Sequence, residues 1–243
     1  MKVLMLASFG LEIVECGGAL ALAQERGDDV EALVLICRQE SQPQVRSASE
    51  KLGISEVSFL GVDAGEVPLE GELKNQIVGH LRRVQPDVVV LQDPEHAQHD
   101  FDPARRTIAL LLSECLAIAP REWRIDECGG YQPSSLPEIY YMSPSRPNCV
   151  VEIQSVLAQK IEAVAELGGQ HEFSAKHWVE RAGRSVLEDL FGDWGDDLAI
   201  LGEKGQKALF RALALSQGLG SHSNVVLGES YRKEGLFVLK QLN

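Results

Sequence analysis

The sequence predicts an α/β protein, a Rossmann-like three-layer sandwich with a mostly parallel central sheet. Short apolar runs alternate along the chain with longer segments of helical period, which is the pattern of βαβ units. The apolar runs are continuous, as expected for strands covered on both faces of a parallel sheet. A chain of 243 residues can bury an ample core. We therefore expect one domain over 1–243, with an α/β core over 1–167 and a helical C-terminal portion over 168–243 packed on that core.

Strands are predicted at the short apolar runs. In chain order these runs lie at 3–7, 30–37, 57–60, 87–91, 139–142 and 149–153. The second run contains contiguous aliphatic residues from Leu33 to Ile36, and the fourth is introduced by Pro86. The fifth is a short strand within a proline-rich loop over 131–148. Together the runs supply the expected central sheet.

Helices are predicted where apolar residues recur at helical spacing. They lie at 17–24, 40–52, 73–84 and 105–118, and a further helix follows the last strand and runs through residue 166. The segment at 105–118 places Ile108, Leu111, Leu112 and Cys115 on one face, so we expect it to be buried. From about residue 168 the chain becomes acidic and glycine-interspersed, and we expect helices there.

Composition and charge exclude some classes of partner. A net charge of −13 and a pI near 4.9 repel phosphate backbones, so we expect no nucleic-acid partner. No apolar stretch approaches the roughly 20 residues of a membrane-spanning helix, so we expect no membrane partner. The five cysteines are scattered and odd in number, and the short apolar start is too brief for a signal peptide. These features suit a reducing compartment, and we expect a cytoplasmic protein.

Two polar stretches follow the first and the fourth predicted strands. The first is A-S-F-G-L-E at 7–12, followed by C-G-G at 16–18, and the second is H-A-Q-H-D-F-D-P-A at 96–104. Open α/β sheets bind ligands at the carboxyl ends of their strands, near the point where the strand order reverses. The two stretches therefore predict a ligand-binding cleft.

These stretches resemble the two halves of the zinc centre in the GlcNAc-PI de-N-acetylase family, the LmbE-like or PIG-L proteins. Segments 46–65, 86–94, 140–160 and 228–231 also resemble the family, so the similarity spans nearly the whole chain. The resemblance implies the LmbE-like fold. It also implies zinc-dependent N-deacetylation as the ancestral activity, and association into homo-oligomers.

The first motif departs from the family pattern A-H-P-D-D-E. Ser8 stands at the position of a histidine zinc ligand, Gly10 at that of the catalytic base, and Leu11 at that of an aspartate ligand. Glu12 matches the family. Zinc hydrolases need the metal to acidify a water, and a base to accept its proton. This half of the motif therefore lacks most of the family's chemistry.

The second motif departs from the family pattern H-P-D-H. The resemblance places His99 at the position that stabilises the tetrahedral oxyanion, so His99 is our candidate catalytic residue. Asp102 stands where the third zinc ligand, a histidine, belongs, and Phe101 replaces the intervening aspartate. A single carboxylate cannot hold zinc against solvent. We therefore expect no cofactor.

The favoured interpretation is an inactive or repurposed family member that binds a small, possibly sugar-like molecule or a protein partner. The predicted ligand-binding cleft takes its residues from both motifs, namely Ser8, Gly10, Leu11, Glu12, His96, His99 and Asp102.

Two enzymatic alternatives and one plain reading stay open. His96, His99 and Asp102 could form a displaced metal site, which would make the chain a metal-dependent N-deacetylase or amidase acting on an N-acetylglucosamine-like molecule. A metal-free enzyme could use His99 as a base. In the plain reading, both histidines lie on an exposed loop, Asp102 caps the next helix and Pro103 is its first residue.

Overall fold

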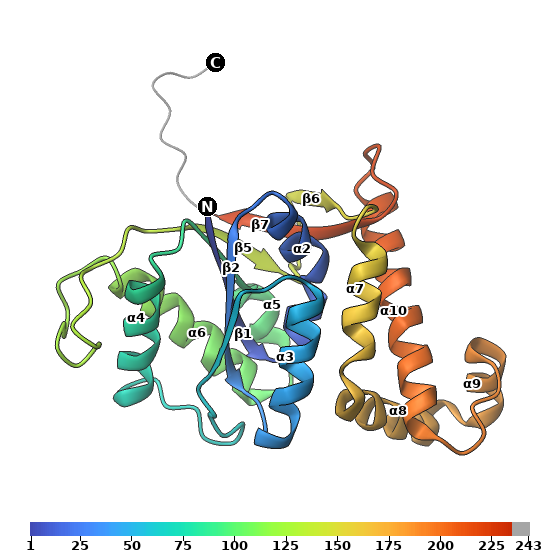
Figure 1. Ribbon diagram of the computed structural model, residues 1–243. Helices are drawn as coiled ribbons and strands as arrows, with labels where there is room; N and C mark the ends of the chain where they lie inside the picture. The colour runs from blue at the N-terminus through green and yellow to red at the C-terminus, as the bar shows by residue number, and fades with distance from the viewer. Residues whose placement is uncertain (235–243) are drawn as a thin grey trace. The chain divides into compact units, whose positions relative to one another are not determined.

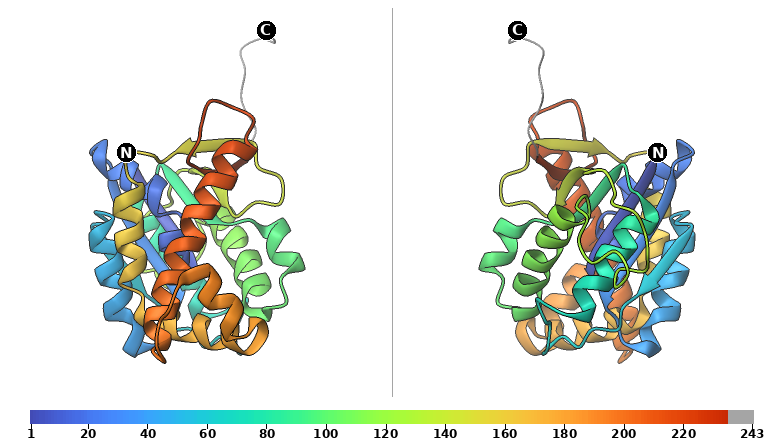
Figure 2. Two further views of the ribbon diagram at one scale, coloured as in Figure 1. Left: turned by 90° about the vertical axis from the view of Figure 1, so that its right-hand side faces the viewer. Right: turned by 90° about the vertical axis from the view of Figure 1, so that its left-hand side faces the viewer.

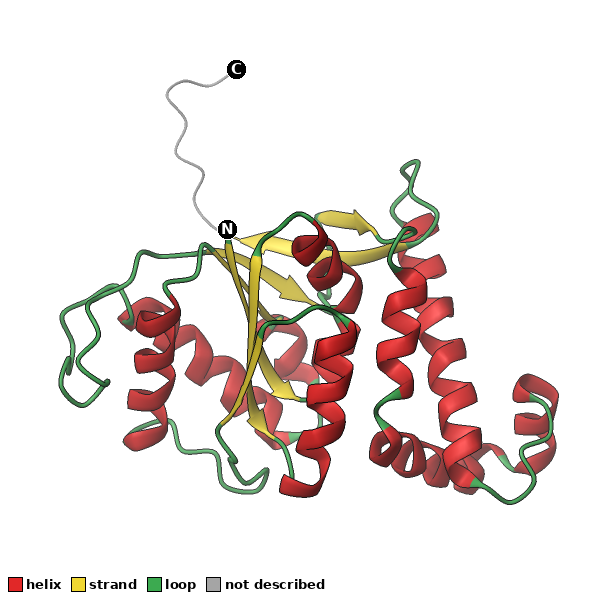
Figure 3. Ribbon diagram, in the orientation of Figure 1, coloured by secondary structure: helices red, strands yellow, loops and turns green. Residues whose placement is uncertain are grey.

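The computed structural model describes residues 1–234, and its sheet has seven strands among them (Figures 1 and 3). The strands are β1 (Lys2–Phe9), β2 (Asp29–Ile36), β3 (Glu56–Phe59), β4 (Val88–Gln92), β5 (Glu138–Met142), β6 (Cys149–Glu152) and β7 (Gly228–Glu234). Their order in the sheet is β3-β2-β1-β4-β5-β7-β6. β1 pairs with β4, β2 with β3 and β4 with β5 in parallel, whereas β5 and β7 are antiparallel. The predicted α/β class with a mostly parallel sheet is confirmed.

The chain divides into two compact units. Among the described residues, the first unit comprises 1–6, 63–149 and 230–234, and the second comprises 7–62 and 150–229. Each motif belongs to one unit, because residues 7–18 fall in the second and residues 96–104 in the first. Whether the chain behaves as a single domain stays a prediction.

The first unit carries three helices among its described residues: α4 (Glu72–Val84), α5 (Pro94–His99) and α6 (Pro103–Ile118). α4 and α5 both pack against α6. Arg82 of α4 is 1% exposed, and its guanidinium donates to the carbonyl of Ala119 at 3.1 Å and to that of Arg121 at 2.6 Å. Each of these carbonyls also accepts a backbone N–H, from Ser134 and Trp123 respectively, so Arg82 is a second donor to both just beyond the end of α6.

The second unit carries the remaining α-helices of the described chain. They are α1 (Leu11–Glu15), α2 (Gly17–Glu25), α3 (Gln42–Lys51), α7 (Leu157–Ala165), α8 (Gly168–Ala182), α9 (Arg184–Phe191) and α10 (Leu198–Gly220). α7 packs on α2, α3 and α10, and α10 also packs along α8. A small cluster of Ala175, Leu187, Trp194 and Leu201 joins α8, α9 and α10.

Two predictions about local structure are wrong. Residues 94–99 form helix α5 instead of an exposed loop, because Asp93 caps this helix and Pro94 is its first residue. The C-terminal portion is not wholly helical, because β7 pairs with β5 in the first unit. Its sequence G-E-S-Y-R-K-E is too polar to signal a strand, and backbone pairing with β5 decides its conformation.

No helix within residues 1–234 is long and apolar enough to span a bilayer.

Candidate functional site

The first motif begins at the carboxyl end of β1, where Ser8 and Glu12 are both buried. The Glu12 side chain turns back on the chain, and its Oε2 accepts the backbone N–H of Ser8 at 2.7 Å. A buried carboxylate is costly unless hydrogen-bond donors surround it, and here the backbone N–H of Ser8 is such a donor. Glu12, the acidic residue that matches the family, therefore fixes the turn between β1 and α1.

Packing leaves no room for a side chain at Gly10, the position at which the resemblance predicts a base. Gly10 lies before α1 with φ −59° and ψ −26°, so its backbone would accept any residue. A Cβ built there would lie 2.5 Å from Cγ2 of Val45, which projects from α3. Leu11 follows as the first residue of α1 and offers no donor or acceptor atom. Neither position can present a carboxylate.

The glycine pair after Cys16 lets α2 begin against a buried carboxylate. Oε1 and Oε2 of Glu229 accept the N–H groups of Gly18 and Ala19 at 2.7 and 2.8 Å. Lys160 of α7 donates to Oε1 of Glu229 at 2.6 Å and to the carbonyl of Glu15 at 2.8 Å. The N-terminus of α2 thus binds an anion from the chain itself, which satisfies donors that a helix start leaves open.

Sequence reasoning missed the roles of Glu229 and Lys160. Both lie in segments that resemble the family, yet nothing in their spacing shows that they meet, since 69 residues separate them. Their burial, at 4% and 3% exposed, is the structural signal. A charged pair buried this deeply is stable only when hydrogen bonds and opposite charge compensate both partners for their lost hydration.

The second motif is preceded by Asp93, which directly follows β4 and is fully buried. Its carboxylate accepts the N–H of Glu95 at 2.9 Å, the N–H of Ser145 at 3.2 Å and an Nη2–H of Arg232 at 3.0 Å. The carboxylate of Asp93 therefore accepts hydrogen bonds from three donors within the chain. It caps α5 and ties the loop after β5 to the end of β4.

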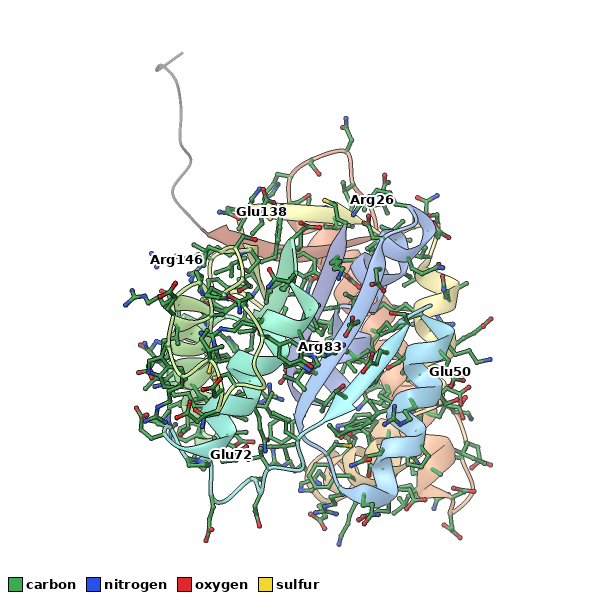
Figure 4. The ribbon with its side chains drawn as sticks, turned by 60° about the vertical axis from the view of Figure 1, so that its left-hand side comes forward. Arg26, Glu50, Glu72, Arg83, Glu138 and Arg146 are labelled. Carbon is green, nitrogen blue, oxygen red and sulfur yellow. The ribbon has the colours of Figure 1, made fainter. Side chains whose placement is uncertain are left out.

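Arg232 of β7 and Arg146 both reach Glu95 on α5. The Arg232 Nη1 lies 2.6 Å from Oε2 of Glu95, and the Arg146 Nη2 lies 2.8 Å from the same atom. Hydrogen bonds from Arg146 and then Arg232 lower the pKa of Glu95 from its ordinary value. Arg146 lies at the surface of this unit (Figure 4). Sequence reasoning missed both arginines, which attach α5 to its surroundings.

Helix α5 presents its two histidines to solvent. His96 and His99 are exposed and three residues apart, so they share one side of the helix. Phe101, in the following turn, is 99% exposed. Asp102 caps α6 by accepting the N–H of Ala104 at 2.9 Å, and Pro103 is the first residue of that helix. The predicted cap and first residue of α6 are confirmed.

The predicted cleft residues fall into two groups. Ser8, Gly10, Leu11 and Glu12 lie together in the second unit, and His96, His99 and Asp102 lie together in the first unit. Within residues 1–234, no group of three or more His, Cys, Asp or Glu side chains is placed to hold a metal ion. Gly10 and Leu11 have no ligand atoms, so the family's zinc does not fit the positions inherited by this chain.

Comparisons with known proteins agree with the fold. No family model matches the chain. Diacetylchitobiose deacetylase of Thermococcus kodakarensis is 27% identical over 121 residues, which are 49% of this chain and 45% of that protein. The match thus spans about half the length of this curated relative.

Solved structures match over most of the chain. N,N'-diacetylchitobiose deacetylase from Pyrococcus horikoshii has a TM-score of 0.69 and 19% identity, over 96% of this chain and 83% of that one. GalB, the 4-carboxy-2-hydroxymuconate hydratase of Pseudomonas putida, has a TM-score of 0.69 and 20% identity, over 100% and 99%. At such identities the likeness shows the fold, and proteins with this fold include both a deacetylase and a hydratase. On sequence and fold together, the chain is similar to the LmbE-like (GlcNAc-PI de-N-acetylase) proteins and has their mostly parallel α/β fold.

Proposed function

We propose that this chain is an LmbE-like protein that no longer hydrolyses N-acetyl groups through a zinc centre, and that it binds a small, sugar-like molecule. The observation that carries the proposal is the packing of Val45 against Gly10, which fills the space that a catalytic carboxylate would need. Hydrolysis requires a base in reach of the attacking water, and a methyl group of Val45 lies where that base would begin.

The remaining carboxylates support the same conclusion. Glu12, Asp93 and Asp102 each accept at least one backbone N–H, and Asp93 also binds Arg232. A zinc site with three protein ligands needs unengaged carboxylate or imidazole atoms that converge on one point. In this chain the acidic side chains near the motifs serve to cap helices and fix turns.

A binding role draws on the exposed surface of α5. The imidazoles of His96 and His99 can each donate and accept a hydrogen bond, as the hydroxyl groups of a sugar require. The fully exposed ring of Phe101 adds an apolar surface beside them. Because Asp93, Glu95 and Arg232 hold α5 in place, little ordering is needed on binding.

A second candidate is a metal-free enzyme that uses His99 as a base for chemistry other than amide hydrolysis. Its support is the likeness to the hydratase, which extends over all of this chain. Such an enzyme would turn over its substrate in the presence of a chelator. That behaviour separates it from a metal-dependent N-deacetylase.

The decisive measurement combines metal content with acetate release. The purified chain is incubated with zinc, dialysed and measured by plasma mass spectrometry, and it is assayed for acetate release from N-acetylglucosamine and N,N'-diacetylchitobiose. We expect substoichiometric zinc that His99→Ala and Asp102→Asn leave unchanged, and no acetate. Stoichiometric zinc lost in both variants, together with acetate release, would establish the N-deacetylase instead.

Binding is measured by calorimetric titration with the same two sugars. We expect His96→Ala and His99→Ala to weaken binding, whereas Gln98→Ala, an exposed change on the same helix, leaves it unchanged. If neither sugar binds the parent chain, the sugar-like ligand class is wrong.

A further inference from the structure

Helix α4 buries a charged side chain beneath the segment that follows α6. We call residues 119–130 of this segment the covering loop. A Cβ at Gly79 of α4 would lie 2.7 Å from the carbonyl oxygen of Cys128, so the covering loop lies directly on the helix. The right view of Figure 2 looks onto α4, and the segment between α6 and β5 crosses in front of it. Arg82 follows Gly79 by three residues, on the same face, and is 1% exposed.

The guanidinium of Arg82 has more donors than the covering loop has acceptors for it. Its Nε and Nη2 donate to the carbonyls of Ala119 and Arg121, and each carbonyl already accepts a backbone N–H. Nη1 is buried and has no hydrogen-bond partner within residues 1–234. A guanidinium carries five N–H groups, so one end of this one has lost its hydration without a replacement.

The charge of Arg82 has no carboxylate partner among the described residues. The two other deeply buried cations in that part of the chain are Lys74 and Lys160, and both form ion pairs. Lys74 lies 2.7 Å from Oε2 of Glu114, and Lys160 lies 2.6 Å from Oε1 of Glu229. Arg82 meets only carbonyl oxygens, which carry partial charges. A full positive charge is therefore buried without an opposite full charge, which is unfavourable.

The thiol of Cys128 does not supply the missing negative charge. Burial raises the pKa of this thiol from its ordinary value, and the positive charge of Arg82 opposes the shift without reversing it. A thiol with a raised pKa stays protonated at neutral pH. Cys128 is thus a neutral neighbour of the guanidinium.

Asn75 provides a contrast on the same face of α4. Its Oδ1 is also buried without a hydrogen-bond partner among the described residues. Asn75 is neutral, so a single ordered water would satisfy it. Water would satisfy the donors of Arg82 but would leave its charge unbalanced.

We propose that the covering loop encloses a binding site for a small monovalent anion of the halide class, held at Nη1 of Arg82. This end of the guanidinium offers both the donors and the full positive charge that a dehydrated anion requires. Because Nη1 is buried beneath a loop that touches α4, the site suits a small ion and excludes larger anions such as phosphate. Bound chloride stabilises the folded chain by mass action.

The site lies within the first unit and shares no residue with either motif. The proposal therefore does not depend on the proposed function.

The first test compares stability in chloride and in gluconate at equal ionic strength. The urea midpoint of the parent chain should rise as sodium chloride replaces sodium gluconate up to about 0.3 M, because an ion that binds only the folded state favours folding. Arg82→Met should lose this dependence. Arg121→Met is the matched control, because it removes an exposed arginine of the same loop but keeps the carbonyl that Arg82 contacts. Circular dichroism verifies that each variant is folded.

Crystallography of the parent chain identifies the occupant even if Arg82→Met does not fold. Crystals grown in sodium bromide are measured at the bromine absorption edge. We expect an anomalous peak within hydrogen-bond distance of Nη1 of Arg82. A water only at that position, or bromide found only elsewhere on the molecule, overturns the proposal. Equal urea midpoints of the parent chain in the two salts, or a chloride dependence that persists in Arg82→Met, overturn it as well.

Discussion

The side chain of Val45 fills the space that any side chain at Gly10 would enter. A Cβ at Gly10 would lie 2.5 Å from Cγ2 and 3.3 Å from Cγ1 of Val45, well inside van der Waals contact. The pair joins the start of α1 to α3 within one unit. An acidic residue at position 10 would therefore fit only if the neighbouring helix moved.

Gly10→Ala should destabilise the chain by about 1–3 kcal/mol, the usual cost of an overpacked core position. The backbone at Gly10 is right-handed helical, where alanine by itself would be favourable, so any loss reports the collision with Val45. Urea denaturation measures the change. In a Val45→Ala background the cost should largely disappear, and equal costs in both backgrounds would show that Val45 is not the obstacle.

Lys160→Met should lower the free energy of unfolding by about 3–5 kcal/mol, because it leaves the buried carboxylate of Glu229 without its ammonium partner. Lys207→Met is the matched control, since the pair of Lys207 with Glu203 lies at the surface of α10. The control should cost under about 1 kcal/mol. Chemical denaturation of both variants measures the difference. Similar losses of unfolding free energy would mean that the buried pair contributes no more to stability than the surface pair.

Arg232→Lys should destabilise the first unit although the charge is kept. The guanidinium reaches Asp93 through Nη2 and Glu95 through Nη1, and a single ammonium cannot hold both carboxylates in that geometry. We expect faster hydrogen exchange over α5 in Arg232→Lys than in the parent chain. Arg146→Lys, which removes only an exposed contact, serves as the comparison. Unchanged exchange over α5 would show that Arg232 does not hold this helix.

Stability should fall as the pH drops below about 6.5 because of His171. Burial lowers the pKa of His171 from its ordinary value, although the hydrogen bond to the Val164 carbonyl opposes this shift. Below the ordinary value the unfolded chain takes up a proton that the folded chain refuses, so acid favours unfolding. The stability lost between pH 7.5 and 5.5 should be smaller in His171→Gln, as measured by urea denaturation at both values.

Cys115 should resist alkylation in the folded chain. Burial raises the pKa of its thiol to about 12, which leaves a thiolate fraction on the order of 10⁻⁴ at pH 8. Iodoacetamide labelling followed by peptide mass spectrometry should find Cys115 unmodified until urea is added, while the half-buried Cys37 and Cys149 react first. The raised pKa also means that stability should decline as the pH rises from about 9 toward 12.

The sheet could be predicted from sequence where burial on both faces imposes a continuous apolar run, as at β1, β2 and β4. β7 could not be predicted, because its polar sequence becomes a strand only by pairing with β5. Helix α5 was missed because it is only six residues long and depends on the Asp93 cap. Such short elements are stabilised by tertiary contacts more than by propensity.

The sequence by itself determined the α/β class, the positions of both motifs after β1 and β4, and the absence of side-chain ligand atoms at Gly10 and Leu11. These properties follow from residue types and from the period of the apolar pattern, which are local. Only the tertiary structure decided what each remaining charge does. It placed Val45 against Gly10, Glu229 at the start of α2 and Arg232 on Asp93, because such contacts join residues far apart in the chain and depend on how the elements pack.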